Sequence, residues 1–218
     1  MDAGLNICVI TPHQDNRRAA FLERLETYIY RQTRQPDSWI VVDHKLPLQT
    51  DLTARIKHGC ELAVADGADL ILIMEDDDWY DDNYIETMST EWQQAGQPDI
   101  IGINSTRYYH IKSQGYVILN HPERASLMST GVSSQGIQTF NWPEDDFVFL
   151  DIPLWHNLKG HLFNAELSVG IKHGIGKTGG VGHKHNWVQY SKDNDWAILR
   201  KWIGQDSEFY EQYFLKNV

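Results

Sequence analysis

The sequence predicts an α/β fold with a mostly parallel central sheet. Short apolar runs alternate with amphipathic segments through the first half of the chain, which is the pattern of strands joined by right-handed helical crossovers. One run, Leu70 to Met74, has the length of a strand buried on both faces. Two of the runs end directly in acids, Asp43 and Glu75, at the strand ends where such sheets bind ligands.

The first half of the chain reads as strand, helix, strand, helix, strand. The predicted strands cover 6–11, 38–43 and 70–74, and the predicted helices between them cover 17–31 and 53–65. The first helix is supported by Phe21, Leu25, Tyr28 and Ile29, which recur at helical spacing. A third helix over 83–94 and a short strand over 99–103 follow.

After residue 105 the regular alternation of predicted strands and helices ends. Segments 108–111 and 116–119 predict a hairpin around 112–115, and 120–139 is expected to be rich in loops. The segment Gly170 to Gly182 holds six of the sixteen glycines, so we expect a mobile loop there. Segments 196–203 and 209–214 predict two closing amphipathic helices. With neither an internal repeat nor a long linker, 1–218 is expected to be one domain.

Charge and composition exclude some classes of partner. The net charge is −11, from 19 basic and 30 acidic residues, which disfavours nonspecific binding to nucleic acid or membranes. No apolar run approaches the roughly 20 residues that span a bilayer, and the first residues do not resemble a signal peptide. We expect a soluble cytoplasmic protein with no membrane partner, in which Cys8 and Cys60 are buried free thiols.

Four consecutive acids, Glu75 to Asp78, follow the apolar run. Like charges at the end of a buried strand repel one another, and a hard cation such as Mg²⁺ or Mn²⁺ removes that repulsion through carboxylate oxygens. The alternative is a solvated acidic turn that caps a helix beginning near Asp81. The buried-looking strand before the acids and the pair Trp79–Tyr80 after them favour a metal site.

Four blocks of sequence, in order, resemble the GT-A class of nucleotide-sugar glycosyltransferases, and within it the family 2-like group. They are Asn6 to Thr11, Trp39 to Asp43, Ile71 to Tyr80 and Trp142 to Phe147. The resemblance covers roughly residues 5 to 150 and implies a Rossmann-like three-layer sandwich with a small acceptor-side hairpin region. Residues 1–105 would then form the nucleotide-sugar and metal half, 106–190 the acceptor half with the glycine-rich loop, and 191–218 the C-terminal helices.

The resemblance assigns roles at the donor side. Glu75-x-Asp77 stands where the family has its Asp-x-Asp metal motif, so Asp77 would bind Mn²⁺ or Mg²⁺ directly. Glu75 would reach the ribose, or the metal through water, with Asp76 beside it, while Asp76 and Asp78 could equally be helix-start or supporting groups. Asp43 would accept from the N3–H of a uracil-like base.

Two further residues are expected on the donor side, and the sequence departs from the family at two places. Thr11 and His13 would lie beside the same base, although a lone histidine is more often a surface polar residue. The sequence departs from the family where Asp43 is followed by His-Lys rather than Asp-Gly-Ser, and where Glu75 replaces the first motif aspartate.

The fourth block resembles the family's Glu-Asp motif, which supplies the acceptor-side base. Asp145, or Asp146 beside it, would take the proton of an acceptor hydroxyl. The alternative is an acidic helix start after Pro143.

The glycine-rich segment is not a P-loop, because the position five before Gly176 is Ile171. It is better interpreted as a lid over the diphosphate, in which Lys172, Lys177 or Lys184 would neutralise phosphate oxygens. By resemblance, His183 or His185 would complete the metal shell.

The predicted function is transfer of a sugar from a nucleoside diphosphate donor, with UDP-sugar favoured, to an acceptor hydroxyl, with inversion if Asp145 is the base. The acceptor could be a glycan, a small molecule, or a hydroxymethylated DNA base as for some phage enzymes. The alternatives are a nucleotidyltransferase acting on a sugar phosphate and a non-catalytic nucleotide-sugar-binding module. The first would normally carry a glycine-rich basic signature where this chain has Thr11 to Asp15.

Overall fold

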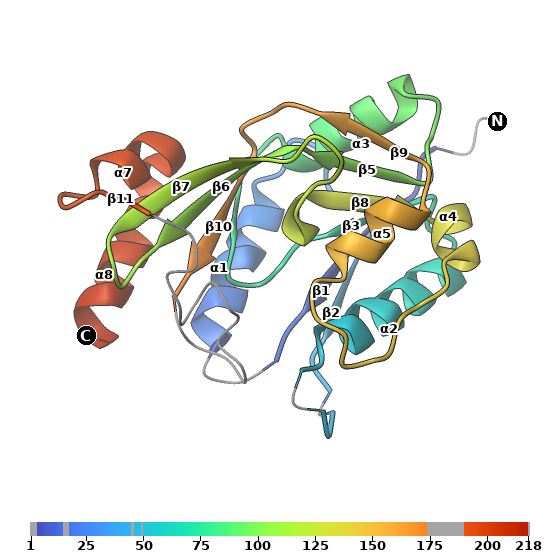
Figure 1. Cartoon of the computed structure of the whole chain (residues 1–218), viewed down its shortest axis with the longest axis horizontal. Helices are drawn as coiled ribbons and strands as arrows, with labels where there is room; N and C mark the ends of the chain where they lie inside the picture. The colour runs from blue at the N-terminus through green and yellow to red at the C-terminus, as the bar shows by residue number, and fades with distance from the viewer. Residues whose placement is uncertain (1–3, 15–17, 45, 49, 174–189, 218) are drawn as a thin grey trace.

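The larger sheet is built mostly from parallel pairs and brings the first half of the chain together. A computed structural model describes residues 4–14, 18–44, 46–48, 50–173 and 190–217 (Figure 1). The six strands of this sheet lie in the order β2-β1-β3-β8-β5-β9. Their bounds are β1 Ile7–Pro12, β2 Ser38–Val42, β3 Leu70–Ile73, β5 Ile100–Ile103, β8 Thr130–Ser133 and β9 Gly160–Phe163. Pairs β1–β2, β1–β3 and β5–β9 are parallel, and β8 runs antiparallel to both of its neighbours.

Helices cover both faces of this sheet and complete three layers. Helices α1 (Ala19–Tyr30) and α3 (Tyr84–Gln94) pack against one set of strand side chains, which includes Val9 and Leu72. Helices α2 (Leu52–Ala65), α4 (Ser134–Thr139) and α5 (Asp151–Asn157) pack against the opposite set (Figure 1). Successive strand side chains point to opposite faces, so strands that are apolar throughout carry a core on each side.

A second sheet joins the late part of the chain to the acidic segment. Its strands lie in the order β11-β7-β6-β10-β4. Their bounds are β4 Trp79–Tyr80, β6 Ser105–His110, β7 Gly115–Asn120, β10 Ser168–Lys172 and β11 Ser191–Lys192. Strand β10 lies parallel to β6 and antiparallel to β4, so it runs beside the residues that follow the four acids.

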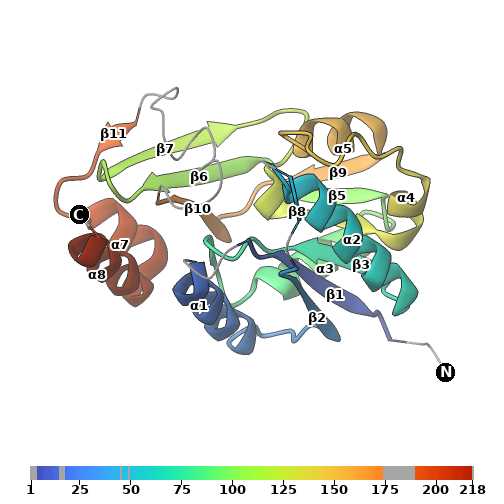
Figure 2. The same ribbon diagram turned by 90° about the horizontal axis from the view of Figure 1, so that it is seen from below.

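The C-terminal helices pack at the end of the molecule where α1 lies. They are α7 (Ala197–Ile203) and α8 (Ser207–Asn217), joined by the 3₁₀ turn η3 (Gly204–Asp206), and Figure 2 shows them beside α1. The Phe21 ring of α1 packs edge-on against Phe209 of α8, with ring centroids 5.8 Å apart. The helices predicted over 196–203 and 209–214 are therefore present, the second one longer than predicted.

The α/β fold, the first three helices and the β6–β7 hairpin are confirmed, but two expectations for the later chain are wrong. Residues 120–139 are not only loops, because they contain the 3₁₀ turn η2 (Leu127–Ser129), strand β8 and helix α4. Residues 170–172 belong to β10 rather than to a loop. Both strands contain a glycine where a side chain would collide: a Cβ at Gly131 would lie 2.7 Å from Leu72 Cδ2. The close packing of β8 and β10 therefore requires glycine, and glycine is the residue that made these segments resemble loops in the sequence.

Two smaller expectations are resolved by the same structure. Cys8 on β1 and Cys60 on α2 are buried free cysteines, as predicted. Helix α3 begins at Tyr84, so the four acids are separated from it by strand β4 and do not cap it. Within the described residues, no helix combines the length and the apolar character needed to cross a bilayer.

Replacing Gly170 by alanine is expected to destabilise the protein by about 1–3 kcal/mol, because overpacking a filled core has that cost. A Cβ at Gly170 would overlap the ring of Tyr108 and lie 3.0 Å from Met128 Sδ. The ring cannot easily move aside, since its hydroxyl lies 2.7 Å from Ser126 Oγ. Thermal unfolding measures the change, and Gly4→Ala is the control because a Cβ there meets nothing within 4 Å. An unchanged Tm for Gly170→Ala would contradict the close packing.

Candidate functional site

The four acids lie at the carboxyl edge of the larger sheet. Strand β3 ends at Ile73, and the amide of Met74 still donates to the carbonyl of Ile10 on β1, at 3.1 Å. The chain then turns, and carboxylate oxygens of Glu75, Asp77 and Asp78 lie within 4.8 Å of one another. Asp77 and Asp78 are buried and Glu75 is partly exposed. Three convergent carboxylates at this edge can hold a hard divalent cation.

Main-chain contacts fix the turn that carries the acids. The amide of Ile171 on β10 donates to Asp78 Oδ1 at 2.7 Å. The amide of Glu75 donates to the hydroxyl of Tyr80 on β4, also at 2.7 Å. The turn is therefore attached to the second sheet on both sides, and its geometry depends on β10, a strand almost 100 residues later in the sequence.

Cationic and imidazole side chains surround the acids. His13 Nδ1 lies 2.6 Å from Asp76 Oδ2, and His173 Nε2 lies 2.7 Å from Asp77 Oδ2. Arg18 contacts both carboxylates through Nη2, at 2.6 Å from Asp77 Oδ1. Both oxygens of Asp76 thus meet basic side chains, Oδ1 with Arg18 and Oδ2 with His13, and Asp76 is not part of the group formed by Glu75, Asp77 and Asp78. This supports the sequence-based option that Asp76 is a supporting group.

The protonation equilibria of the acids reflect burial and mutual repulsion. Burial, followed by repulsion from Asp77, raises the pKa of Glu75 to about 7. The same two causes raise the pKa of Asp78 well above its ordinary value. Burial alone would lower the pKa of Lys172, but the carboxylates of Asp78, Asp77 and Glu75 outweigh it and raise that pKa. The raised pKa values of Glu75 and Asp78 therefore reflect an excess of negative charge in a buried environment.

Two residues at this site were not predicted from the sequence, and a third was predicted to have a different role. Arg18 was not predicted, His173 was not predicted, and Lys172 was assigned to a phosphate-binding lid. Lys172 instead ends β10, with Nζ 4.9 Å from the ring centroid of Tyr108. His173 follows it directly, buried against Phe21 at a ring-centroid distance of 4.3 Å. The only signal for Lys172 and His173 in the sequence was their basic side chains in Gly-Ile-Lys-His, because β10 itself was not predicted.

The residues predicted to hold the nucleotide base lie along the adjacent edge. In the β1–β2 register Thr11 is opposite Val41, and the amide of His13 donates to the carbonyl of Val42 at 3.0 Å. Asp43 follows directly and is exposed. Thr11 is buried and its Oγ1 accepts from Trp39 Nε1 at 2.9 Å. The structure thus brings Thr11, His13 and Asp43 to one edge, with His13 linking them to the acids.

The predicted acceptor-side acids lie on the segment between α4 and α5, over the first turns of α2. The carbonyl of Asp145 accepts from the Ala54 amide at 3.2 Å, and its side chain, 55% exposed, lies 3.4 Å from Lys57 Nζ. The carbonyl of Asp146 accepts from Thr50 Oγ1 at 2.6 Å. No helix begins after Pro143, because the next one starts at Asp151. The alternative of an acidic helix start is therefore wrong, and the base role remains a prediction.

Four predicted residues of the glycine-rich segment, Lys177, His183, Lys184 and His185, lie outside the residues that the structure describes. Their proposed contacts with phosphate and metal therefore remain predictions from the resemblance. The histidine late in the chain that does reach an acid of the described site is His173.

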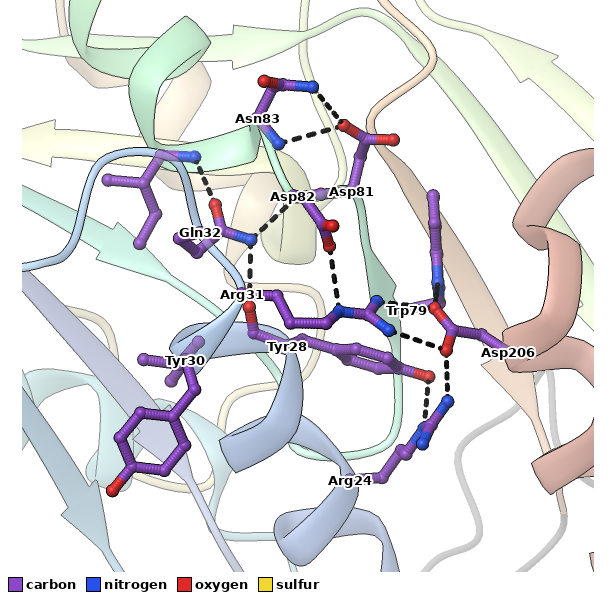
Figure 3. Close-up of polar contacts among 12 residues, drawn as sticks. Arg24, Tyr28, Tyr30, Arg31, Gln32, Trp79, Asp81, Asp82, Asn83 and Asp206 are labelled. Carbon is purple, nitrogen blue, oxygen red and sulfur yellow. Dashed lines mark hydrogen bonds and ion pairs between the residues drawn. The ribbon is translucent and has the colours of Figure 1, made fainter.

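Asp206 connects the turn η3 to α1 and to β4, the strand that follows the acids. Its carboxylate accepts from Trp79 Nε1 at 2.8 Å and from Arg31 at 2.7 and 3.0 Å, and it also pairs with Arg24 (Figure 3). Figure 3 shows these donors converging on the one carboxylate from α1, from the residue that follows it, and from β4. Burial would raise the pKa of Asp206, but the hydrogen bonds from Arg31 and Trp79 outweigh it and lower that pKa.

A polar hollow of about 700 Å³ lies at the opposite edge of the sheet, near the start of β1, where Asn6, Arg34 and Glu86 contribute to its lining. Parallel sheets bind ligands beyond their carboxyl ends, so the acidic edge is the better candidate site.

The arrangement has the GT-A fold of nucleotide-sugar glycosyltransferases, as the resemblance predicted. A structure of S. aureus TarS 1–349 in complex with UDP-GlcNAc matches 97% of this chain and 72% of that chain, with a TM-score of 0.58 and 9% identity. The same protein in complex with UDP matches 77% of this chain and 60% of that chain, with a TM-score of 0.56 and 8% identity. A longer TarS chain matches 77% of this one with a TM-score of 0.53 and 10% identity, and 37% of its own length is covered.

No protein-family model matches the sequence, and the comparison with curated proteins gives no match. At identities of 10% or less the likeness to TarS concerns the fold. What the site does must therefore be argued from its own residues.

Proposed function

We propose that this protein is a metal-dependent glycosyltransferase that moves a sugar from a nucleoside diphosphate to an acceptor hydroxyl. The observation that carries the proposal is the convergence of Glu75, Asp77 and Asp78 at the carboxyl edge of a GT-A sheet. Among the described residues, the fixed cations at the cluster are Arg18 and Lys172, against four carboxyl groups. A divalent cation compensates the remaining negative charge with ligands of the kind it prefers.

The side chains present suit Mn²⁺ or Mg²⁺. Carboxylate oxygens are hard donors, and imidazole is accepted by Mn²⁺ more readily than by Mg²⁺. Asp77 would be the direct ligand, Glu75 would reach the ion or the ribose, and His173 is the described histidine placed to support them. When bound, the ion would neutralise the charge that the departing diphosphate develops.

The donor would lie along the edge formed by β1 and β2. The exposed carboxylate of Asp43 is suited to accept from the N3–H of uracil, which favours a UDP-sugar. Thr11 and His13 would border the base, and the contact of His13 with Asp76 would connect the base pocket to the acids. Lys177 remains a proposed phosphate ligand.

On the acceptor side, Asp145 would be the general base, with Asp146 as its neighbour. Its exposed carboxylate can accept a proton from an incoming hydroxyl, and attack from the face opposite the diphosphate would invert the anomeric carbon. Transfer assays with a glycan, a small hydroxyl compound and hydroxymethylated DNA would then distinguish the classes of acceptor.

A ligand screen by thermal shift tests the donor assignment. UDP, GDP, CDP and ADP are each added with Mn²⁺ and with EDTA. We expect UDP to stabilise the protein only when Mn²⁺ is present. The stabilisation should be about 2.7 kcal/mol at a UDP concentration of a hundred times Kd, because a ligand that binds only the folded state shifts the folding equilibrium. Isothermal titration gives the affinity, and UDP binding that is equal in EDTA would argue against the metal-dependent site.

A further inference from the structure

Arg18 occupies a position between two of the acids. It immediately precedes α1, and its Nη2 contacts the Oδ1 atoms of both Asp76 and Asp77. The side chain is 14% exposed, so this is a buried contact rather than a surface ion pair. A guanidinium group keeps its charge at every working pH. The positive charge at Asp77 is therefore permanent while Arg18 stays in place.

The contact places Arg18 in competition with any metal bound by Asp77. Asp77 belongs to the convergent group with Glu75 and Asp78, while Asp76 does not. A divalent ion and a guanidinium a few ångström apart repel each other, and a buried site screens that repulsion poorly. The two cations cannot both make full use of the Asp77 carboxylate.

Arg18 has an alternative partner when it leaves Asp77. Its Nη2 already contacts Asp76 Oδ1, and Asp76, which is not part of the convergent group, contacts His13 through its other oxygen. Its buried Nε finds no hydrogen-bond partner in the described part of the chain, so the present position satisfies the guanidinium incompletely. Leaving Asp77 would therefore cost the arginine less than leaving a fully satisfied position.

We propose that Arg18 is an internal counter-ion that holds Asp77 in the metal-free protein and is exchanged for the divalent cation when the metal binds. The inference rests on the proposed function, because it takes Asp77 as a metal ligand. It assigns Arg18 two effects: it stabilises the crowded acids without metal, and it lowers the intrinsic metal affinity.

Direct Mn²⁺ binding to the purified protein tests the proposal without an activity assay. Free Mn²⁺ is followed by electron paramagnetic resonance during titration of wild type, Arg18→Gln, Arg18→Lys and Arg200→Gln. We expect Arg18→Gln to bind Mn²⁺ about tenfold more tightly or better, because the repulsion at a buried site is removed. Arg18→Lys should lie between, since lysine keeps the positive charge but carries it on a more flexible stem that can withdraw from Asp77.

Arg200→Gln is the matched control, because it removes the same charge from a pair with Glu211 on the C-terminal helices. Its Mn²⁺ affinity should equal that of wild type. If Arg18→Gln fails to fold in EDTA but folds with Mn²⁺, the counter-ion role is supported, and if it folds in neither, Arg18→Lys decides. Wild-type affinity equal to or greater than that of the Arg18 variants overturns the inference and leaves the metal site intact. Absence of Mn²⁺ binding in every protein overturns the inference and the proposed metal dependence together.

Discussion

Asp77→Asn is expected to lower Mn²⁺-dependent hydrolysis of a UDP-sugar about 100-fold or more, since even partners outside the ligand shell contribute factors of 10–100 to metal sites. Asp77 is the acid that lies within the convergent group and also contacts Arg18 and His173. An amide at this position keeps the shape but removes the charge that would bind the ion. Released UDP gives kcat/KM, and titration gives the Mn²⁺ affinity of the same samples.

Measuring the Tm of Asp77→Asn distinguishes a loss of metal binding from unfolding of the variant. Removing the charge of Asp77 lowers its repulsion with Glu75 and Asp78 but also removes its ion pair with Arg18, so the two effects oppose each other and the Tm in EDTA should change little. Glu61→Gln is the control, since it makes the same chemical change on α2 at a side chain that is 60% exposed. Full Mn²⁺-dependent hydrolysis by Asp77→Asn would exclude Asp77 as the ligand.

Asp206→Ala is expected to destabilise the fold by about 2–3 kcal/mol, below the usual range for a broken buried pair because Arg31 is partly exposed. The change leaves Arg24, Arg31 and the indole N–H of Trp79 without their shared acceptor. For a chain of this size the Tm should fall by about 5–10 °C. Thermal unfolding followed by circular dichroism measures the shift.

The pH dependence of this effect has a defined sign. The pKa of Asp206 is lowered in the folded state, so its stabilisation is present above the unfolded-state value of about 3.9 and is lost as the pH falls through the folded value. The Tm difference between wild type and Asp206→Ala should therefore shrink as the pH is lowered below about 4. Asp82→Ala is the control, because Asp82 binds the same Arg31 but is 49% exposed and should contribute under about 1 kcal/mol. Equal Tm losses for the two variants would contradict the assignment of Asp206 as the central acceptor.

The first half of the fold was accessible from sequence because its signals are local. Apolar runs such as Leu70–Met74 and the helical spacing of Phe21, Leu25 and Tyr28 predicted strands and helices within about two residues of their observed bounds. Strand β8 was not accessible in this way. It is short, contains Gly131, and is specified by strands β3 and β5 on either side of it.

In the candidate site, too, local sequence signals could be predicted and contacts between distant residues could not. The acids could be predicted from one contiguous stretch, and their convergence at a sheet edge followed from the strand before them. Arg18 and His173 could not, because their roles depend on contacts that span 59 and 96 residues of sequence, respectively. The acceptor-side prediction of Asp145 came from resemblance, and its place over α2 depends on backbone contacts that no local pattern specifies.

The dependence of α1 and β4 on Asp206 has a consequence for biosynthesis. Arg24 and Arg31 leave the ribosome 182 and 175 residues before the carboxylate that binds them, and Trp79 leaves 127 residues before it. At about 5–20 residues per second, the nascent chain carries these donors without their acceptor for roughly 6–36 seconds. The strand β4 that follows the acids thus lacks its Asp206 contact in a partly synthesised chain until η3 has been translated.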